Sequence, residues 1–125
     1  MLADREAVAT IPVKDLDAAR RFYGDTLGLT SSGDENSEFS SYRCGSTSLL
    51  VYRSKYAGTN QATAVTWLVG DEVDRIVRDL RGKGVGFEHY QMPDTKLEGD
   101  VHVTGDQRAA WFKDPDGNII AVVGT

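Results

Sequence analysis

The 125-residue chain lacks the features that mark disulfide-rich, secreted or membrane-spanning proteins. Its single cysteine, Cys44, excludes a disulfide within the chain. No apolar run approaches the roughly 20 residues that a membrane-spanning helix needs. The charged N-terminus, MLADREAV, does not have the pattern of a signal peptide. We therefore expect a cytoplasmic protein that has no membrane partner.

Basic residues are also in the minority. Fourteen Lys and Arg stand against 19 Asp and Glu, which gives a formal net charge of −5. Nucleic-acid-binding proteins neutralise phosphates with clustered Lys and Arg, whereas the pair Arg20-Arg21 is typical of the solvated face of a helix. We expect no nucleic-acid partner. The length is that of one domain with a single core, and we expect residues 1–125 to form it.

What the sequence does contain is an internal repeat. Val13–Leu29 reads VKDLDAARRFYGDTLGL, and Val69–Val85 reads VGDEVDRIVRDLRGKGV. The two segments have equal length, open with Val-x-Asp and close on Gly followed by an aliphatic residue. Apolar residues recur at helical spacing in both, so each predicts an amphipathic helix. The predicted buried positions are Leu16, Ala19, Tyr23 and Leu27 in the first helix, and Val73, Ile76, Val77 and Leu80 in the second.

The ends of the two helices are predicted from their capping residues. Asp15 and Asp71 are placed to accept hydrogen bonds from free N–H groups of the first turn. Gly28 can take the left-handed conformation that ends the first helix, and either Gly82 or Gly84 can end the second.

Segments rich in β-forming residues surround each helix. They predict a first module at about residues 5–53, a linker at about 54–62 and a second module at about 63–124. The motif Asp114–Gly117, DPDG, predicts a hairpin turn in which Gly117 takes a positive φ. This turn accounts for its carboxylates without a catalytic role. Gln91–Gln107 is predicted to be a long irregular segment, and segments of that length are often functional.

The order βαβββ, repeated twice, occurs here with the motifs IPVKDLDAARRFYGDTLGL and AAWFKDPDGNIIAVV. This combination resembles the vicinal oxygen chelate superfamily, which includes glyoxalase I, extradiol dioxygenases, fosfomycin-resistance enzymes and bleomycin-resistance binding proteins. The resemblance covers essentially the whole chain. It implies an α+β fold in which two tandem βαβββ modules form a partly open eight-stranded barrel around a ligand cup. It also implies a homodimer. The fold hosts many reactions, so it does not identify the activity.

Metal-using members of the superfamily place ligands on the first and last strands of each module. The matching positions here are Val8, Ala64, Ala121 and either Leu49 or Leu50. None of these side chains can donate an electron pair to a metal ion. We therefore expect no metal and no other cofactor. We expect Val8, Ala64, Leu49 and Ala121 to form an apolar floor of the cup instead.

Strand alternation selects the other residues that would face the cup. Thr10 lies on the first strand and Thr66 on the fifth, where Trp67 would pack beneath the helix. Tyr52 and Arg53 end the fourth strand, and only one of them can face the cup; Arg53 is the charged candidate. The predicted ligand-binding residues are Thr10, Tyr42, Leu49, Arg53, Thr66, His102, Trp111 and Ala121.

Two functions remain open at this point. The first is metal-independent binding of an apolar or aromatic metabolite or drug, as in the bleomycin-resistance type, and this is the function that we favour. The alternative is a metal-free lyase, isomerase or cyclase that uses His102, Arg53 or a tyrosine as an acid–base group. His102 is a better catalytic candidate than His89 because it lies in the long segment. An enzyme needs two titratable groups within hydrogen-bond reach of one point. A metal-dependent glyoxalase or dioxygenase comes third.

Overall fold

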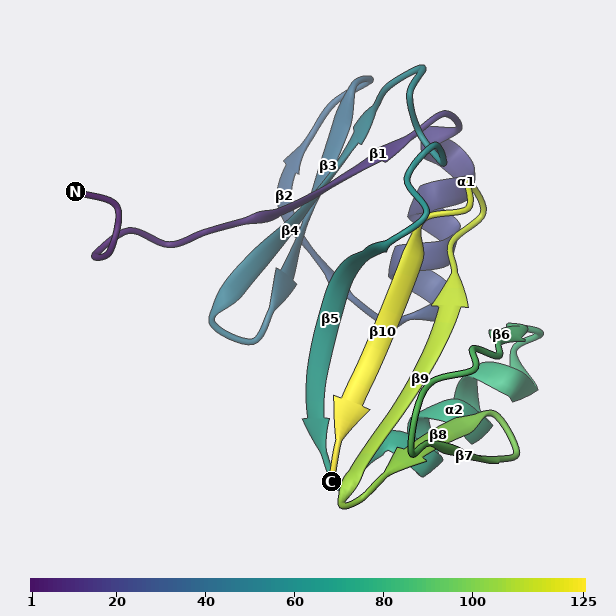
Figure 1. Cartoon of the computed structure of the whole chain (residues 1–125). Helices are drawn as coiled ribbons and strands as arrows, with labels where there is room; N and C mark the ends of the chain where they lie inside the picture. The colour runs from purple at the N-terminus through teal and green to yellow at the C-terminus, as the bar shows by residue number, and fades with distance from the viewer. The chain divides into compact units, whose positions relative to one another are not determined.

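The computed structural model describes residues 1–125, and the chain divides into two compact units. Unit 1 consists of Met1–Asn60 with Pro115–Gly117, and unit 2 consists of Gln61–Asp114 with Asn118–Thr125. Each unit contains its own mixed sheet and its own helix (Figure 1). No helix in the structure is long and apolar enough to cross a membrane.

Unit 1 has the predicted order βαβββ. Its elements are β1 (Ala9–Val13), α1 (Leu16–Arg20), the π-helical continuation η1 (Arg21–Thr26), β2 (Thr30–Glu35), β3 (Phe39–Cys44) and β4 (Thr47–Arg53). The strands lie in the order β1-β4-β3-β2. The outer pair β1 and β4 is parallel, and the other pairs are antiparallel.

The first helix confirms its predicted start, end and buried face. The Asp15 carboxylate accepts a hydrogen bond from the Ala18 N–H at 3.0 Å, and Gly28 takes a φ of +74° just beyond the helix. Leu16, Ala19 and Tyr23 are buried. These side chains pack on the sheet because they recur on one side of the helix.

Unit 2 begins with the same β–α pair but continues with more strands than predicted. Its elements are β5 (Thr63–Gly70), α2 (Val73–Gly82), β6 (Phe87–Glu88), β7 (Lys96–Glu98), β8 (Val101–Thr104), β9 (Gln107–Lys113) and β10 (Ile119–Gly124). The sheet order is β5-β10-β9-β8-β7, and the short β6 pairs with β9 beyond the end of β8.

The second helix confirms its buried stripe but not its predicted cap. Val73, Val77 and Leu80 are buried against the sheet. The residue before the helix is Glu72, however, and no side chain caps the first turn, so the prediction for Asp71 is wrong. The neighbouring acidic residue places the helix start one position later than the Val-x-Asp repeat indicates.

Three further expectations are corrected by the strands. The structure has ten strands in two separate sheets, where the sequence predicts eight in one partly open barrel. Gln91–Gln107 is not irregular throughout, because it contains the hairpin of β7 and β8. Gly99, with a φ of +64°, forms the turn of this hairpin. Strands of three and four residues are too short for an alternating pattern to reveal them.

The DPDG turn between β9 and β10 is confirmed, and its first carboxylate has a structural role. Gly117 has a φ of +90°. The buried Asp114 carboxylate accepts hydrogen bonds from the Asn118 backbone N–H at 2.9 Å and from the Asn118 side-chain amide at 2.8 Å. A carboxylate held in this way fixes the turn and is not available for catalysis.

The end of β10 gives a stability prediction. A Cβ atom on Gly124 would overlap the backbone carbonyl of Gly70, to which the Thr125 N–H donates a hydrogen bond. We expect Gly124→Ala to lower the free energy of unfolding by about 1–3 kcal/mol, because backbone must shift to make room. Denaturant unfolding monitored by circular dichroism measures the change.

Gly86→Ala is the matched control for this prediction. Gly86 lies in the same unit, has no positive φ and has no atom within 4 Å of the added Cβ. We expect it to change the stability by no more than about 0.5 kcal/mol. An equal loss of stability in both variants would contradict the close approach of Gly124 to Gly70.

Candidate functional site

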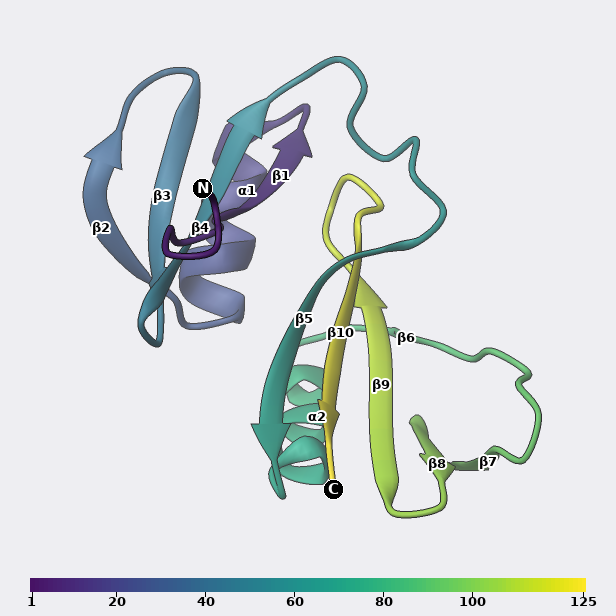
Figure 2. The same ribbon diagram turned by 60° about the vertical axis from the view of Figure 1, so that its left-hand side comes forward.

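The candidate site lies on the face of the second sheet that α2 does not cover. The Arg108 guanidinium on β9 donates to Asp74 of α2 at 2.8 and 2.9 Å, which identifies the side of β9 that faces the helix. Because side chains alternate along a strand, Trp111 points to the opposite side. Figure 2 shows α2 behind β5 and β10, with this opposite side towards the viewer.

Cross-strand pairing extends this opposite side over the sheet, since paired residues share a face. Trp111 pairs with Ala121, which pairs in turn with Thr66, and His102 pairs with Ala109. We call this surface the open face. Its residues include Thr66, Leu68, Glu88, Leu97, His102, Ala109, Trp111, Lys113, Ala121 and Val123.

The indole of Trp111 lies across β10. Its Nε1–H donates to the Oγ1 of Thr63 at 3.2 Å. Trp111 is on β9 and Thr63 is on β5, and β10 runs between them. Neighbouring strands are about 4.8 Å apart, so the indole has to pass over β10 to reach Thr63. Ala121 is the residue beside Trp111 on β10, and it is only 2 % exposed although it lies on the open face. A small residue at this position is what leaves room for the indole.

His102 lies beside this indole and is 1 % exposed. Its ring centroid is 4.8 Å from that of Trp111, with the ring planes at 89°, and 6.1 Å from that of Tyr90. The Tyr90 backbone N–H donates to the His102 Nε2 at 2.9 Å. Since Nε2 accepts this bond, the neutral ring carries its proton on Nδ1.

The Nδ1–H of His102 is the unusual group of the site. Nδ1 is buried, and no protein atom accepts a hydrogen bond from it. An unsatisfied buried donor costs on the order of 1–3 kcal/mol, so each one in a native structure requires an explanation. Neither ring nitrogen is bonded to a titratable side chain. The arrangement can therefore donate one hydrogen bond to a bound molecule, but it contains no acid–base pair.

The other histidine belongs to an ion-pair network at the edge of the unit. His89 Nε2 is 2.7 Å from an Asp100 oxygen, and Arg81 donates to the other oxygen at 2.5 and 3.1 Å. These bonds, that of His89 first, hold the pKa of the Asp100 carboxyl below its usual value. His89 is half exposed. Its contacts are those of a structural residue, in contrast to the buried His102.

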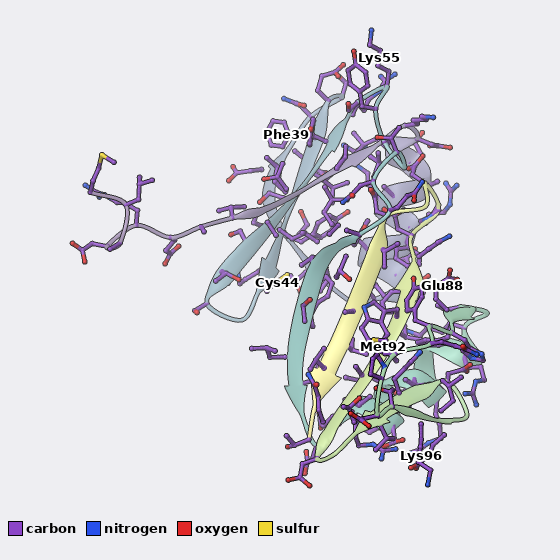
Figure 3. The ribbon with its side chains drawn as sticks, viewed as in Figure 1. Phe39, Cys44, Lys55, Glu88, Met92 and Lys96 are labelled. Carbon is purple, nitrogen blue, oxygen red and sulfur yellow. The ribbon has the colours of Figure 1, made fainter.

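Tyr90 is the residue of the site that the sequence reasoning missed. It follows β6, in a loop that Glu88 and Met92 mark in Figure 3. Burial, and then the nearby Glu88, raise the pKa of its phenol, so this group remains protonated near neutral pH. Its aromatic side chain in FEHYQ was the available signal. Its backbone contact with His102, which lies 12 residues further on, leaves no pattern in the sequence.

The structure places five of the eight predicted ligand-binding residues on a sheet face away from the helix. Thr66, His102, Trp111 and Ala121 lie on the open face of unit 2. Thr10 lies on the face of the first sheet opposite α1, where it pairs with Leu50. The structure also places Trp67 on the α2 side of β5, since it pairs with Val122 and not with Ala121.

The other three predicted residues, Tyr42, Leu49 and Arg53, lie on the side of the first sheet that faces α1. Tyr42 pairs with Leu49, both are buried, and the Tyr42 ring contacts Tyr23 of the helix at 6.2 Å between centroids. Arg53 shares this side because it is two residues after the buried Val51. A slip of one residue in the register reverses the face of a whole strand. Tyr52, and not Arg53, therefore lies on the side of Thr10.

Arg53 contributes instead to two charged surface grooves of unit 1. They have volumes of about 600 and 450 Å³, and both are lined by Lys14 and Arg53. Glu38 and Lys55 line the larger groove, and Asp17 lines the smaller. No group of three or more His, Cys, Asp or Glu side chains in the structure is arranged to hold a metal ion.

Comparison with solved structures shows the same fold in several proteins. A lactoylglutathione lyase from Agrobacterium tumefaciens is 20% identical with a TM-score of 0.74, over 99% of this chain and 96% of its own. A glyoxalase/bleomycin resistance protein/dioxygenase from Alicyclobacillus acidocaldarius is 17% identical with a TM-score of 0.72, over 97% and 91%. The fosfomycin resistance protein FosX from Listeria monocytogenes, as its E126Q mutant with Mn(II) and 1S,2S-dihydroxypropylphosphonic acid, is 16% identical with a TM-score of 0.72, over 100% and 93%.

Identities of 20% and below show a shared fold and not a shared activity. No curated protein has a significant match to the sequence. The family model described as Glyoxalase/Bleomycin resistance protein/Dioxygenase superfamily matches residues 7–122. This match covers both helices and all ten strands except the end of β10. The chain therefore belongs to the glyoxalase/bleomycin resistance protein/dioxygenase superfamily.

Proposed function

We propose that the protein binds a small apolar or aromatic molecule, a metabolite or a drug, on the open face of unit 2 without a metal ion. The observation that carries the proposal is the group of Trp111, His102 and Tyr90 beside a floor of small side chains. Ligand sites combine aromatic and aliphatic walls with a few polar groups. Leu68, next to this floor, is 84 % exposed. Exposed apolar side chains grouped on one surface are typical of binding sites.

The metal ions used by other members of the superfamily do not fit the residues of this chain. The first-strand positions are Val8 and Ala64, and Leu50 is the last-strand position that shares its sheet face with Thr10. The remaining position, Ala121, lies beneath the indole of Trp111. Divalent ions require nitrogen, oxygen or sulfur donors, and none of these side chains has one.

The crossing of the indole over Ala121 can be tested by substitution. We expect Ala121→Leu to displace the indole, break the bond to Thr63 and lower the free energy of unfolding by about 1–3 kcal/mol through overpacking. Tryptophan emission in a Trp67→Phe background reports only Trp111, and it should shift to longer wavelength. Leu68→Ala is the control, because this exposed side chain lies on the same face. An unchanged emission in Ala121→Leu would contradict the crossing.

A metal-free lyase, isomerase or cyclase is the alternative. The buried His102 is the observation in its favour, since buried neutral imidazoles serve as acid–base groups in many enzymes. Such a reaction needs a second titratable group at the same point. His102 has no such partner among its hydrogen bonds. Binding is therefore the function that the geometry supports better.

We also propose that the protein is a homodimer, as small members of the superfamily commonly are. β5 is an edge strand of eight residues, and Leu68 on it is exposed. Long edge strands present unpaired N–H and C=O groups to other chains. We expect light scattering to give twice the 13.7 kDa chain mass at protein concentrations of about 10–50 μM, where a functional dimer persists. A monomer mass at these concentrations would contradict the proposal.

Mass spectrometry of freshly isolated protein tests the proposed binding directly. We expect one apolar or aromatic molecule per site to be released by organic solvent, and treatment with EDTA to leave it bound. Trp111→Ala should lose this molecule because it removes the aromatic wall. Lys14→Ala, in the charged grooves of unit 1, should retain it. Retention of the molecule by Trp111→Ala, or one tightly held transition metal per chain, would sink the proposal.

A further inference from the structure

We propose that His102 determines the chemical class of the ligand: a flat, uncharged aromatic molecule that carries a carbonyl oxygen. The Nδ1–H of His102 would donate to this oxygen, while the ring of the ligand lies against the indole of Trp111. This inference rests on the proposed function, because it concerns the same face of unit 2. It adds a requirement that an apolar site alone does not impose.

The hydrogen bond from Tyr90 determines which nitrogen of His102 carries the proton. The Tyr90 amide is a backbone group that always donates, and it points at Nε2 from 2.9 Å. A protonated Nε2 would place two hydrogens against each other. The bond therefore holds the neutral ring in one tautomer, with its proton on Nδ1. The two nitrogens lie on different edges of the imidazole, so Nδ1–H points away from Tyr90.

The Nδ1–H of His102 has apolar and aromatic surroundings. The neighbours of the ring on the sheet are the cross-strand partners Leu97 and Ala109 and the indole of Trp111. A perpendicular aromatic ring can accept only a weak N–H···π contact. In an apolar environment a full hydrogen bond to the same donor is stronger than in water. A ligand that brings an acceptor atom therefore gains more here than it would at the surface.

Access to Nδ1 and the shape of the ligand both depend on the indole of Trp111. Nδ1 is closed to solvent, and the indole of Trp111 is the aromatic ring whose centroid lies nearest to that of the imidazole. One hydrogen bond, to the exposed Thr63, holds the indole over β10. A ligand reaches Nδ1 when the indole leaves Thr63. Since aromatic rings stack or meet edge to face, a flat aromatic molecule recovers the ring contacts that this movement gives up.

The charged residues of the open face bear on the charge of the ligand. Two charged residues lie on the open face: Glu88, which pairs with Trp111, and Lys113, two residues after Trp111 on β9. Their side chains are 3.4 Å apart, and the two charges compensate each other. A carboxylate or phosphate ligand would lose its hydration without meeting a free cation. A ketone, ester or quinone oxygen accepts a hydrogen bond without this penalty, so the acceptor is uncharged.

The matched probes 1-indanone and indane test the inference. Both are flat bicyclic molecules of nearly equal size, and only the first has a carbonyl. We expect the wild-type protein to bind 1-indanone about tenfold more tightly than indane, as isothermal titration calorimetry would measure. His102→Met should abolish this preference, since the thioether can weakly accept from the Tyr90 amide but has no hydrogen to donate. His89→Met is the matched control and should retain the preference.

The outcomes separate the two proposals. Equal affinity of the wild-type protein for both probes would overturn the role of His102 and leave the proposed binding function standing. Retention of the preference in His102→Met would overturn it as well. No binding of either probe to the wild-type protein would count against both proposals.

A measurement on the wild-type protein does not depend on the folding of any variant. Nitrogen-15 NMR of the labelled imidazole distinguishes the protonated nitrogen from the unprotonated one. We expect the proton of His102 on Nδ1, and we expect its resonance to move downfield when 1-indanone is added but not when indane is added. A proton on Nε2, or the same response to both probes, would overturn the inference.

Discussion

The indole of Trp111 crosses β10 above Ala121, and the arrangement of the open face depends on this crossing. It needs a methyl group at position 121 and an acceptor at Thr63, two strands away from Trp111. With the indole in place, Ala121 is covered and His102 acquires its nearest aromatic neighbour. Ala121, where the sequence predicts the superfamily's last-strand metal position, is thus covered by an aromatic side chain. Its small side chain is a packing requirement of the indole from the neighbouring strand.

The two units show how one repeat can serve two purposes. In both, a strand and a following helix form the buried half, with apolar side chains between helix and sheet. In unit 1 the ring of Tyr42 packs against the helix, so this aromatic side chain belongs to the core. In unit 2 the strand β8, which takes the sheet position that β2 takes in unit 1, places His102 on the side away from the helix. The polar group of the site therefore lies on a strand of the repeat itself.

Much of the fold could be predicted from the sequence, because local patterns determine it. The capping carboxylate of Asp15, the positive φ of Gly117 and the outward side of Thr66 each follow from a few neighbouring residues. The site was less predictable. The faces of Tyr42, Leu49 and Arg53 depend on a register that a one-residue slip reverses. The tautomer of His102 depends on a backbone amide in another segment, which no side-chain pattern encodes.

In the proposed site, apolar contact and one hydrogen bond would contribute to ligand binding in different ways. Apolar burial stabilises a complex by about 25 cal/mol per Å² without regard to direction, so it gives affinity with little selectivity. A buried donor rejects a ligand that lacks an acceptor, because the donor would remain unpaired. His102 gives one such donor, fixed in direction by the Tyr90 amide. Fixing it has a consequence for reactivity: the nitrogen that could accept a proton is already engaged. In this arrangement Nδ1–H of His102 is the group that can donate to an oxygen atom, while Nε2 is occupied by the Tyr90 amide.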